Sequence, residues 1–226
     1  MRAAAVVVAG GSGRRVGGAV RKQYLEIAGK PVLLRAILPF LQHPAIHRVV
    51  VVLPADDAAS PPGWLAPDVT VVPGGAERGD SVWNGLAALP DDVDFVLVHD
   101  GARPFVTREV VDRVLAMAPR ASIAAVPVTD TIKQVAHDGR ITGTPDRALL
   151  WQAQTPQGFP RDRLLRAYAQ ARNAGLAATD DAAVYERYEG PVWVVTGSYG
   201  NLKVTRPEDL AVAQALALAP EAGASE

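Results

Sequence analysis

The sequence contains no cysteine, which excludes disulfide bonds, thiol catalysis and cysteine-ligated metals. Its longest apolar runs have the length of strands and are too short to span a membrane. The net charge is −1, whereas a nucleic-acid-binding protein usually carries a basic excess. A strand pattern begins within two residues of Met1, where a signal peptide would show a basic region and then an apolar one. We therefore predict a cytoplasmic protein that binds neither nucleic acid nor a membrane.

Acidic side chains are absent from residues 1–25, and this stretch contains a glycine-rich loop. The apolar run 3–8 predicts a buried strand, and glycines follow it at positions 10, 11, 13, 17 and 18. Glycine lets the backbone approach a ligand closely, and successive N–H groups in such a loop form an anion-binding site. Arg14, Arg15, Arg21 and Lys22 cluster behind the first of these glycines. We predict that the loop binds a polyphosphate; a surface hairpin with solvated arginines is the alternative.

The two common phosphate-loop motifs do not fit this loop. A Walker A motif requires a lysine where the sequence has Ala19. The dinucleotide fingerprint requires a third glycine where the sequence has Val16. The loop by itself therefore does not distinguish a polyphosphate site from a surface hairpin, and other segments of the chain are needed.

Apolar segments of strand length alternate with segments of helical pattern along the chain. Predicted strands cover residues 3–8, 48–53, 69–72, 95–98, 123–126, 192–195 and 201–204. Predicted helices cover residues 31–41, 80–89, 107–118 and 160–173, with one after a cap at 179–181 and one after a capping box from Thr205 to Glu208. Continuously apolar strands indicate a mainly parallel sheet with helices on both faces. We predict one α/β domain over residues 1–226.

The alternation breaks between residues 128 and 150. Two short strand patterns, 131–135 and 140–142, flank a turn at His137-Asp138-Gly139. An isolated hairpin is only marginally stable in water. We therefore predict that residues 128–150 form a β-arm that projects from the domain and packs against a partner subunit.

Three conspicuous segments follow predicted strands, at residues 9–22, 74–81 and 99–104. Ligands of parallel α/β sheets bind at the carboxyl ends of the strands. Asp100 is well placed there to hold Mg²⁺ together with substrate phosphates. A simple ion pair between Asp100 and Arg103 is an equally open alternative. His99 is predicted to be structural, because no partner at metal-ligand spacing accompanies it.

Other polar residues admit both a functional and a structural interpretation. Lys203 is one of four lysines and precedes the last helix, so an ordinary exposed lysine is its alternative. Thr131 and Arg147 lie on the predicted arm, where a solvated hairpin face would explain them. For the polar and aromatic run 151–157 the structural interpretation is a turn packed under Trp151, and for 179–181 it is a helix N-cap.

Taken in order along the chain, these motifs resemble one known family. They are Ala9 to Arg15, Lys22-Gln23-Tyr24, Gly74-Gly75 with Glu77-Arg78 and Asp80-Ser81-Val82, His99 to Pro104, Asp130 to Lys133, Thr155-Pro156-Gln157, Thr179 to Ala182 and Lys203-Val204-Thr205. The set resembles the 2-C-methyl-D-erythritol 4-phosphate cytidylyltransferases of the non-mevalonate isoprenoid pathway, from Ala3 to about Leu218. The resemblance implies a Rossmann-like three-layer sandwich of the nucleotide-diphospho-sugar transferase type, with the arm crossing a homodimer.

The resemblance also implies a role for each motif. The backbone from Ala9 to Gly13 would hold the CTP triphosphate, and Asp100 would bind Mg²⁺ or another divalent cation. Arg15 and Lys22 would stabilise charge on the α-phosphate, while Lys203 and Arg147 would position methylerythritol 4-phosphate; these four are the predicted catalytic residues. Gly75 and Ser81 would read the cytosine. The predicted substrate-binding residues are Ala9, Gly10, Gly11, Gly13, Gly75, Ser81, Asp100, Ala102, Arg103, Thr131 and Thr179.

The implied reaction is direct attack of the substrate phosphate on the α-phosphorus of CTP, with loss of pyrophosphate and no protein nucleophile. The chain departs from the family at Arg21, where a proline is usual, and at Ala76, which offers no side-chain contact to the nucleotide. Two alternatives stay open. One is a cytidylyltransferase for another polyol phosphate such as ribitol 5-phosphate, and the other is a nucleotide sensor without catalysis.

Overall fold

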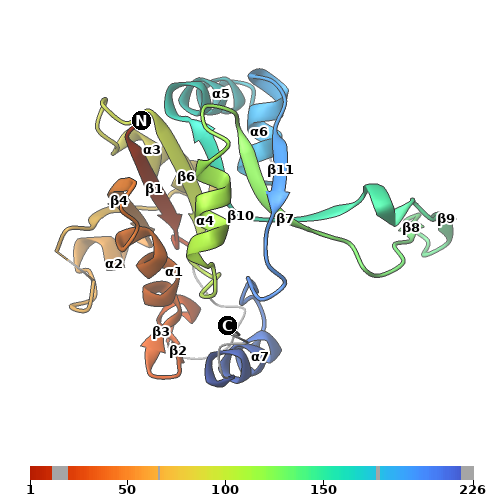
Figure 1. Cartoon of the computed structure of the whole chain (residues 1–226), viewed down its shortest axis with the longest axis horizontal. Coiled ribbons are helices and arrows are strands. Elements are labelled where there is room, and N and C mark those ends of the chain that lie inside the picture. Colours follow the sequence, from red (N-terminus) through yellow and green to blue (C-terminus); the bar gives the residue numbers. More distant parts are fainter. Residues whose placement is uncertain (12–19, 66, 177–178, 220–226) are drawn as a thin grey trace, which may run out of the picture.

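A seven-stranded sheet forms the centre of the molecule in this computed structural model, which describes residues 1–11, 20–65, 67–176 and 179–219 (Figure 1). The sheet order is β11-β7-β10-β6-β1-β4-β5. Its strands are β1 (Ala3–Val8), β4 (Ile46–Leu53), β5 (Thr70–Pro73), β6 (Phe95–Asp100), β7 (Ser122–Pro127), β10 (Trp151–Pro160) and β11 (Trp193–Thr196). The main helices are α1 (Val32–Leu41), α3 (Arg78–Ala87), α4 (Arg108–Leu115), α5 (Arg161–Asn173), α6 (Asp181–Tyr188) and α7 (Pro207–Leu218).

The sheet is mainly parallel, as predicted. β1 pairs in parallel with β4 and β6, β4 with β5, and β7 with β11. β10 is the exception, because it runs antiparallel between β6 and β7. The prediction of a turn over residues 151–157 was therefore wrong. The register shifts between Ala153 and Gln157, so the regular pairing of β10 with β7 is interrupted in the middle of that polar run.

Helices cover both faces of the sheet, which confirms the three-layer sandwich. Alternate residues of β1 point to opposite faces, so Ala4 and Val6 enter one core cluster while Ala5 and Val7 enter the other. The first cluster is completed by apolar side chains of α3, α5 and α6, and the second by those of α1 and α4. A strand buried on both faces needs apolar side chains at every position, which explains the continuous runs in the sequence.

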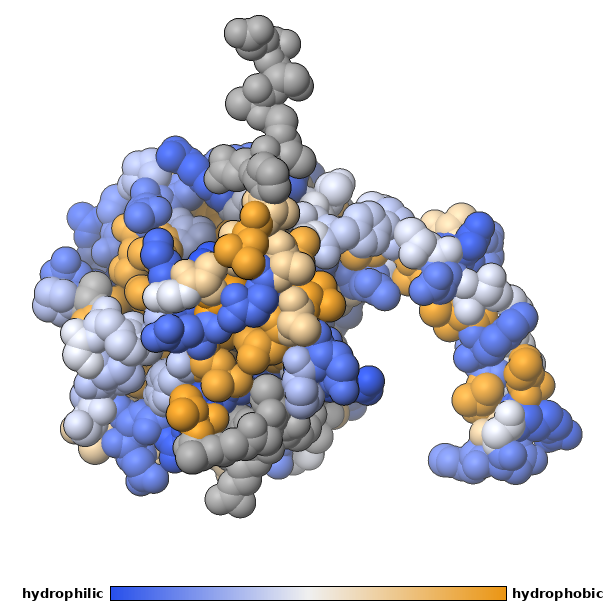
Figure 2. Space-filling model, turned by 90° about the horizontal axis from the view of Figure 1, so that it is seen from below, coloured by the Kyte–Doolittle hydropathy of each residue, from blue (hydrophilic) through white to orange (hydrophobic). Residues whose placement is uncertain are grey.

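The arm projects from the body between β7 and β10, as Figures 1 and 2 show. It carries a small hairpin of β8 (Gln134–Val135) and β9 (Ile141–Gly143) and the 3₁₀ turn η3 (Arg147–Leu149). The hairpin was predicted, but its strands are shorter than expected. Val135, Ile141 and Leu149 expose more than half of their surface. Apolar side chains are thus left uncovered along the arm.

Smaller elements differ from the predictions at their boundaries. Residues 201–204 form no strand, and α4 ends at Leu115. The carboxylate of Asp209 caps α7 by accepting from the N–H of Arg206, and it also accepts from the N–H and hydroxyl of Thr205, so the predicted pairing of Thr205 with Glu208 was wrong. The remaining short elements are α2 (Ala55–Ala59), η2 (Lys22–Tyr24), β2 (Glu26–Ile27) and β3 (Lys30–Pro31). No helix in the described ranges is both long and apolar enough to cross a bilayer.

Candidate active site

A cleft of about 620 Å³ opens at the carboxyl ends of β1, β5 and β6. The segment after β1, the start of α3 and the end of β6 supply most of its wall, and η2 and the segment before α7 close it. The predicted site residues that line it are Ala9, Gly10, Gly11, Lys22, Gly75, Ser81, Asp100, Ala102 and Lys203. Segments far apart in the sequence therefore meet where a doubly covered parallel sheet is expected to bind its ligand.

Close backbone approach explains the glycines on one side of the cleft. A Cβ atom on Gly10 would lie 3.1 Å from Ser81 Oγ and 3.2 Å from Gly74 Cα. The buried Ser81 hydroxyl accepts a bond from the N–H of Gly75 at 3.1 Å and donates to the carbonyl of Glu77 at 3.2 Å. Ser81 thus fixes the loop between β5 and α3, and the missing side chain of Gly10 lets the loop after β1 lie close to it.

The loop after β1 is held from the other side by η2. Gln23 Nε2 donates to the carbonyl oxygens of Ala9 at 3.2 Å and Gly11 at 3.4 Å. Lys22 Nζ donates to the carbonyl of Val204 at 2.9 Å, which links η2 to the segment that carries Lys203. Gly13 and Arg15, which were predicted to contact the triphosphate, lie outside the described residues.

Asp100 lies at the centre of the charged groups in the cleft. Its Oδ2 is 2.8 Å from Lys203 Nζ and 3.8 Å from Arg103 Nε, and its Oδ1 is 3.3 Å from Arg78 Nε. Burial by itself would raise the pKa of Asp100, but Arg78, Lys203 and Arg103 outweigh it and lower that pKa below its usual range. The carboxylate therefore stays ionised. The predicted Asp100–Arg103 pair is present, as one contact among these three.

His99 is a structural histidine that is linked to the backbone of Asp100 through the side chain of Thr155. Its Nε2 lies 3.2 Å from the carbonyl oxygen of Arg103, which can only accept, so we assign the proton to Nε2. The Thr155 hydroxyl then donates to His99 Nδ1 at 2.9 Å and accepts from the N–H of Asp100 at 3.0 Å. Complete burial lowers the pKa of His99 to about 4, so the ring is neutral.

A smaller pocket of about 260 Å³ adjoins the cleft on the far side of Asp100. Arg103, Thr179 and Lys203 line it, together with polar groups of β10 such as Gln154 and Gln157. Lys203 was predicted to position the second substrate, and Arg103 and Thr179 were predicted to bind substrate; the fold brings the three together. Thr131 and Arg147 lie instead on the arm, where Arg147 Nη1 donates to the carbonyl of Thr129 at 2.7 Å.

Sequence reasoning missed several side chains that build this site. Arg78 pairs with Asp100, and Gln23 holds the first loop, yet neither was assigned a role. Asp181 was interpreted as part of a helix cap, but its buried carboxylate binds Arg78. The available signal was the position of Arg78 and Asp181 within the motifs that carry the family resemblance.

The fit of a divalent cation rests on Asp100. Among the described residues, no group of three or more His, Cys, Asp or Glu side chains could hold a metal by itself. Mg²⁺ is commonly bound by one or two carboxylates together with substrate phosphates and water. One ionised carboxylate beside a glycine-rich loop fits that mode of binding, with the phosphates as the other ligands.

Comparisons with known proteins agree with the geometry. Residues 3–218 match the sequence model of the 2-C-methyl-D-erythritol 4-phosphate cytidylyltransferase family. The enzyme of that name from Symbiobacterium thermophilum is 45% identical over 214 residues, which cover 93% of this chain and 91% of the relative. The one from Syntrophus aciditrophicus is 44% identical, covering 93% and 94%.

Solved structures give the same result. The crystal structure of 2-C-methyl-D-erythritol 4-phosphate cytidylyltransferase from Thermus thermophilus matches with a TM-score of 0.78 at 34% identity, covering 94% of this chain and 97% of that one. The 4-diphosphocytidyl-2C-methyl-D-erythritol synthase from Anaerococcus prevotii matches with a TM-score of 0.80 at 28% identity, covering 94% and 96%. The similarity therefore extends over the body and the arm.

Proposed function

The chain belongs to the 2-C-methyl-D-erythritol 4-phosphate cytidylyltransferase family, and we propose that it catalyses this family's reaction in the cleft around Asp100. The enzyme transfers CMP from CTP to 2-C-methyl-D-erythritol 4-phosphate in the non-mevalonate isoprenoid pathway. A phosphate oxygen of the acceptor forms a bond to the α-phosphorus of CTP. The bond from that phosphorus to the bridging oxygen breaks, and pyrophosphate leaves with the electron pair.

One observation carries the assignment of the site. Lys203, Arg103 and Arg78 converge on the buried Asp100, directly beside the backbone of the loop after β1. A reaction between two phosphate groups needs both anions brought together and their charge neutralised. Three cations around one carboxylate supply an excess of positive charge there. The absence of cysteine is consistent with a transfer that forms no covalent enzyme intermediate through a thiol.

The residue roles follow from the position of each side chain. Backbone from Ala9 to Gly11 would hold the triphosphate, with Gly13 and Arg15 continuing the same loop. Lys22 would stabilise the charge that grows on the α-phosphate in the transition state, where fixed cations contribute most. Gly75, Ala102 and the loop fixed by Ser81 would contact the nucleoside.

The acceptor would bind in the adjoining pocket. Arg103, Thr179 and Lys203 line that pocket and would hold the phosphate and hydroxyl groups of methylerythritol phosphate. Asp100, between the two compartments, would hold Mg²⁺, which supplies charge neutralisation when bound.

Thr131 and Arg147 would need a second subunit to contact the substrate. Both lie on an arm that projects away from the body (Figure 1), so we propose that they complete the cleft of the partner in a homodimer. The exposed apolar side chains of the arm, including Val135 and Ile141, support an interface along it. The cytoplasmic location stays a prediction.

The decisive test is pyrophosphate release by the purified protein with Mg²⁺ and CTP. Methylerythritol 4-phosphate and ribitol 5-phosphate are supplied in parallel reactions. We expect release with the first and at most slow release with the second. Release with ribitol 5-phosphate alone would change the assigned substrate but keep the mechanism. No release with either, together with measurable CTP binding, would contradict the proposed function and favour a nucleotide sensor.

A further inference from the structure

We propose that Asp181 and Tyr168 are positioning residues, which orient Asp100 for the reaction by holding the guanidinium group of Arg78. The inference rests on the proposed function, because it deepens the role of Asp100 in the same site. Neither residue lines the cleft among the described residues. Their influence on the reaction would therefore pass through Arg78.

Arg78 is shared between two carboxylates through different edges of its guanidinium plane. Nη1 and Nη2 donate to the two oxygens of Asp181, at 3.1 and 2.8 Å. Nε, on the adjacent edge, donates to Asp100 Oδ1 at 3.3 Å. The guanidinium group is rigid and planar, so a bidentate partner on one edge fixes the direction of the other. Asp181 therefore determines where the bond to Asp100 points.

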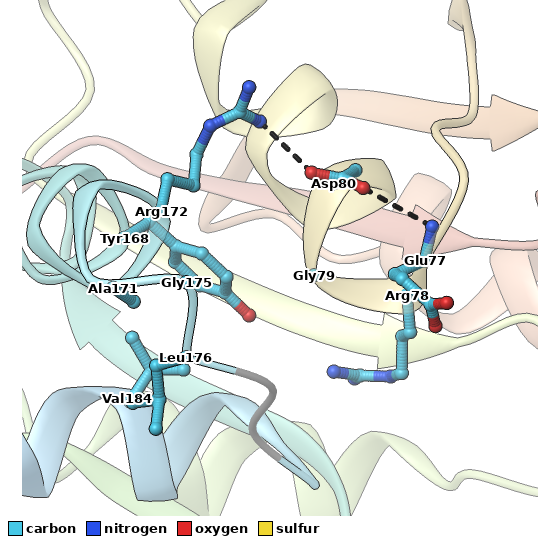
Figure 3. A pocket seen from close by; sticks show the side chains of 10 residues that line it. All are labelled: Glu77, Arg78, Gly79, Asp80, Tyr168, Ala171, Arg172, Gly175, Leu176 and Val184. Carbon is cyan, nitrogen blue, oxygen red and sulfur yellow. Dashed lines mark hydrogen bonds and ion pairs between the residues drawn. The ribbon is translucent and has the colours of Figure 1, made fainter.

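Tyr168 also holds the carboxylate of Asp181. Its hydroxyl donates to Asp181 Oδ1 at 2.5 Å. Figure 3 shows the Tyr168 ring extending from α5 and the Arg78 side chain extending from α3, on the wall of a third pocket of about 420 Å³. Asp181 and Tyr168 are both buried, at 0% and 3% exposure. Buried and fully bonded groups have little freedom to move.

The first turn of α6 keeps Asp181 in place. The N–H of Ala182 donates to Gln157 Oε1 at 3.0 Å, and the side chain of Asp180 accepts from the N–H of Ala183 at 3.0 Å. Gln157 Nε2 also donates to Asp180 at 2.9 Å. Since Gln157 belongs to β10, which pairs with β6, the same sheet carries Asp100 and anchors Asp181.

Charge balance gives the direction of the expected effect. Arg78 carries a positive charge, because a guanidinium group does not lose its proton in proteins, and this charge is shared between Asp181 and Asp100. If Asp181 were replaced by a neutral residue, Arg78 would keep only one of these two ion pairs, the one with Asp100. Arg78 would then turn toward Asp100 and compete with a cation for its oxygens. A higher concentration of divalent cation should then be needed to occupy the site, while the contacts of the nucleotide with the rest of the cleft stay intact.

The test compares Tyr168→Phe and Asp181→Asn with Tyr185→Phe. Tyr185 is a suitable control because it is a buried tyrosine of the same core cluster, packs on Phe159 and donates no hydroxyl bond among the described residues. Binding of Mn²⁺ is measured by electron paramagnetic resonance with CTP present, alongside kcat, KM for CTP and the midpoint of thermal unfolding. The Mn²⁺ readout does not depend on turnover.

We expect Asp181→Asn to weaken Mn²⁺ binding and lower kcat by about 10–100-fold, the usual effect of removing a group that orients a metal ligand. Tyr168→Phe should act in the same direction by about 3–10-fold, as the milder change. KM for CTP should stay within about twofold in both, and Tyr185→Phe should change neither Mn²⁺ binding nor kcat.

A lower melting temperature in Tyr168→Phe with unchanged Mn²⁺ binding and unchanged kcat would overturn the inference, because it would show a purely structural role. Asp181→Asn changes a buried charge and can fail to fold, so Tyr168→Phe, which removes one hydroxyl, decides the question in that case. A wild-type protein that binds Mn²⁺ with CTP but releases no pyrophosphate would refute the proposed function; the Mn²⁺ comparison would still decide the positioning role.

Discussion

At the scale of single residues, His99 shows how burial changes the protonation of a side chain. The ring is completely buried between Asp100 and Arg103, and its pKa falls to about 4. An unfolded histidine titrates near 6.5. Between pH 6.5 and pH 4, His99 is protonated in the unfolded chain but not in the folded chain. The free energy of unfolding therefore decreases as the pH falls through this range.

This difference predicts a pH dependence that can be measured. From the two pKa values, His99 should lower the free energy of unfolding by about 2 kcal/mol between pH 7 and pH 5. Denaturant unfolding of wild type and His99→Gln at both pH values, with EDTA present and at equal protein concentration, tests this. The variant should lose about 2 kcal/mol less than wild type over that interval.

The comparison uses the change in free energy of unfolding with pH in each protein, so any stability that the substitution itself removes at both pH values cancels. Asp100 does not interfere, because its pKa lies below its usual range and it stays ionised throughout this interval. If the free energy of unfolding changed equally between pH 7 and pH 5 in wild type and His99→Gln, His99 would not be buried as a neutral ring.

At the scale of elements, the contact between α3 and β1 sets a limit on side-chain size. A Cβ atom on Gly85 would lie 2.4 Å from Val6 Cγ1 and 3.0 Å from Val52 Cγ2. A Cβ atom on Gly79, in the same helix, would meet Tyr168 Cε1 at an ordinary 3.6 Å. Helix propensity favours alanine over glycine at both positions, by up to about 1 kcal/mol.

The two glycines should therefore respond oppositely to the same substitution. Gly85→Ala forces extra volume into a packed core, which costs about 1–3 kcal/mol and exceeds the gain in helix propensity. Gly79→Ala should instead leave the free energy of unfolding unchanged or raise it by up to about 1 kcal/mol. Chemical denaturation of both variants measures the contrast. A stabilised Gly85→Ala would show that α3 does not approach the sheet this closely.

Prediction from sequence worked best for elements with a simple periodic pattern. The strands around β1 were evident because a strand buried on both faces is apolar throughout. β10 was missed because its central residues Gln154, Thr155 and Gln157 are polar yet buried. Their side chains bond to groups distant in sequence, such as Ser198, His99 and Asp180. A local pattern cannot report such partners.

At the scale of the whole molecule, the candidate site was predictable only in part. Residues at strand ends, such as Asp100 and Lys203, could be placed because topology brings those ends to one edge. The Arg78–Asp181 pair joins α3 to α6 across more than a hundred residues, and no spacing in the chain indicates it. The arm was recognisable because it interrupts the pattern, whereas the cleft that Arg147 serves depends on how two chains assemble and not on any local pattern.

Two complementary variants can assign the cleft that Arg147 serves. Lys22→Ala removes a cation from the body, and Arg147→Ala removes one from the arm. Each variant alone is expected to lose most of its turnover. In a heterodimer of the two, purified with two different affinity tags, the arm of the Lys22→Ala chain would complete the intact body of the Arg147→Ala chain. Activity should recover to about half of the wild-type dimer, since one of two symmetric sites is intact.

A heterodimer of Lys22→Ala with Lys203→Ala is the matched control, because both defects then lie on the body and each cleft retains one of them. It should stay inactive. If each arm instead served the cleft of its own chain, every cleft in the Lys22→Ala and Arg147→Ala heterodimer would also carry a defect, and no activity would return. Recovery in the first heterodimer and its absence in the second can arise only when the arm reaches across the dimer, so this pair of measurements assigns Arg147 to the partner's site or excludes it.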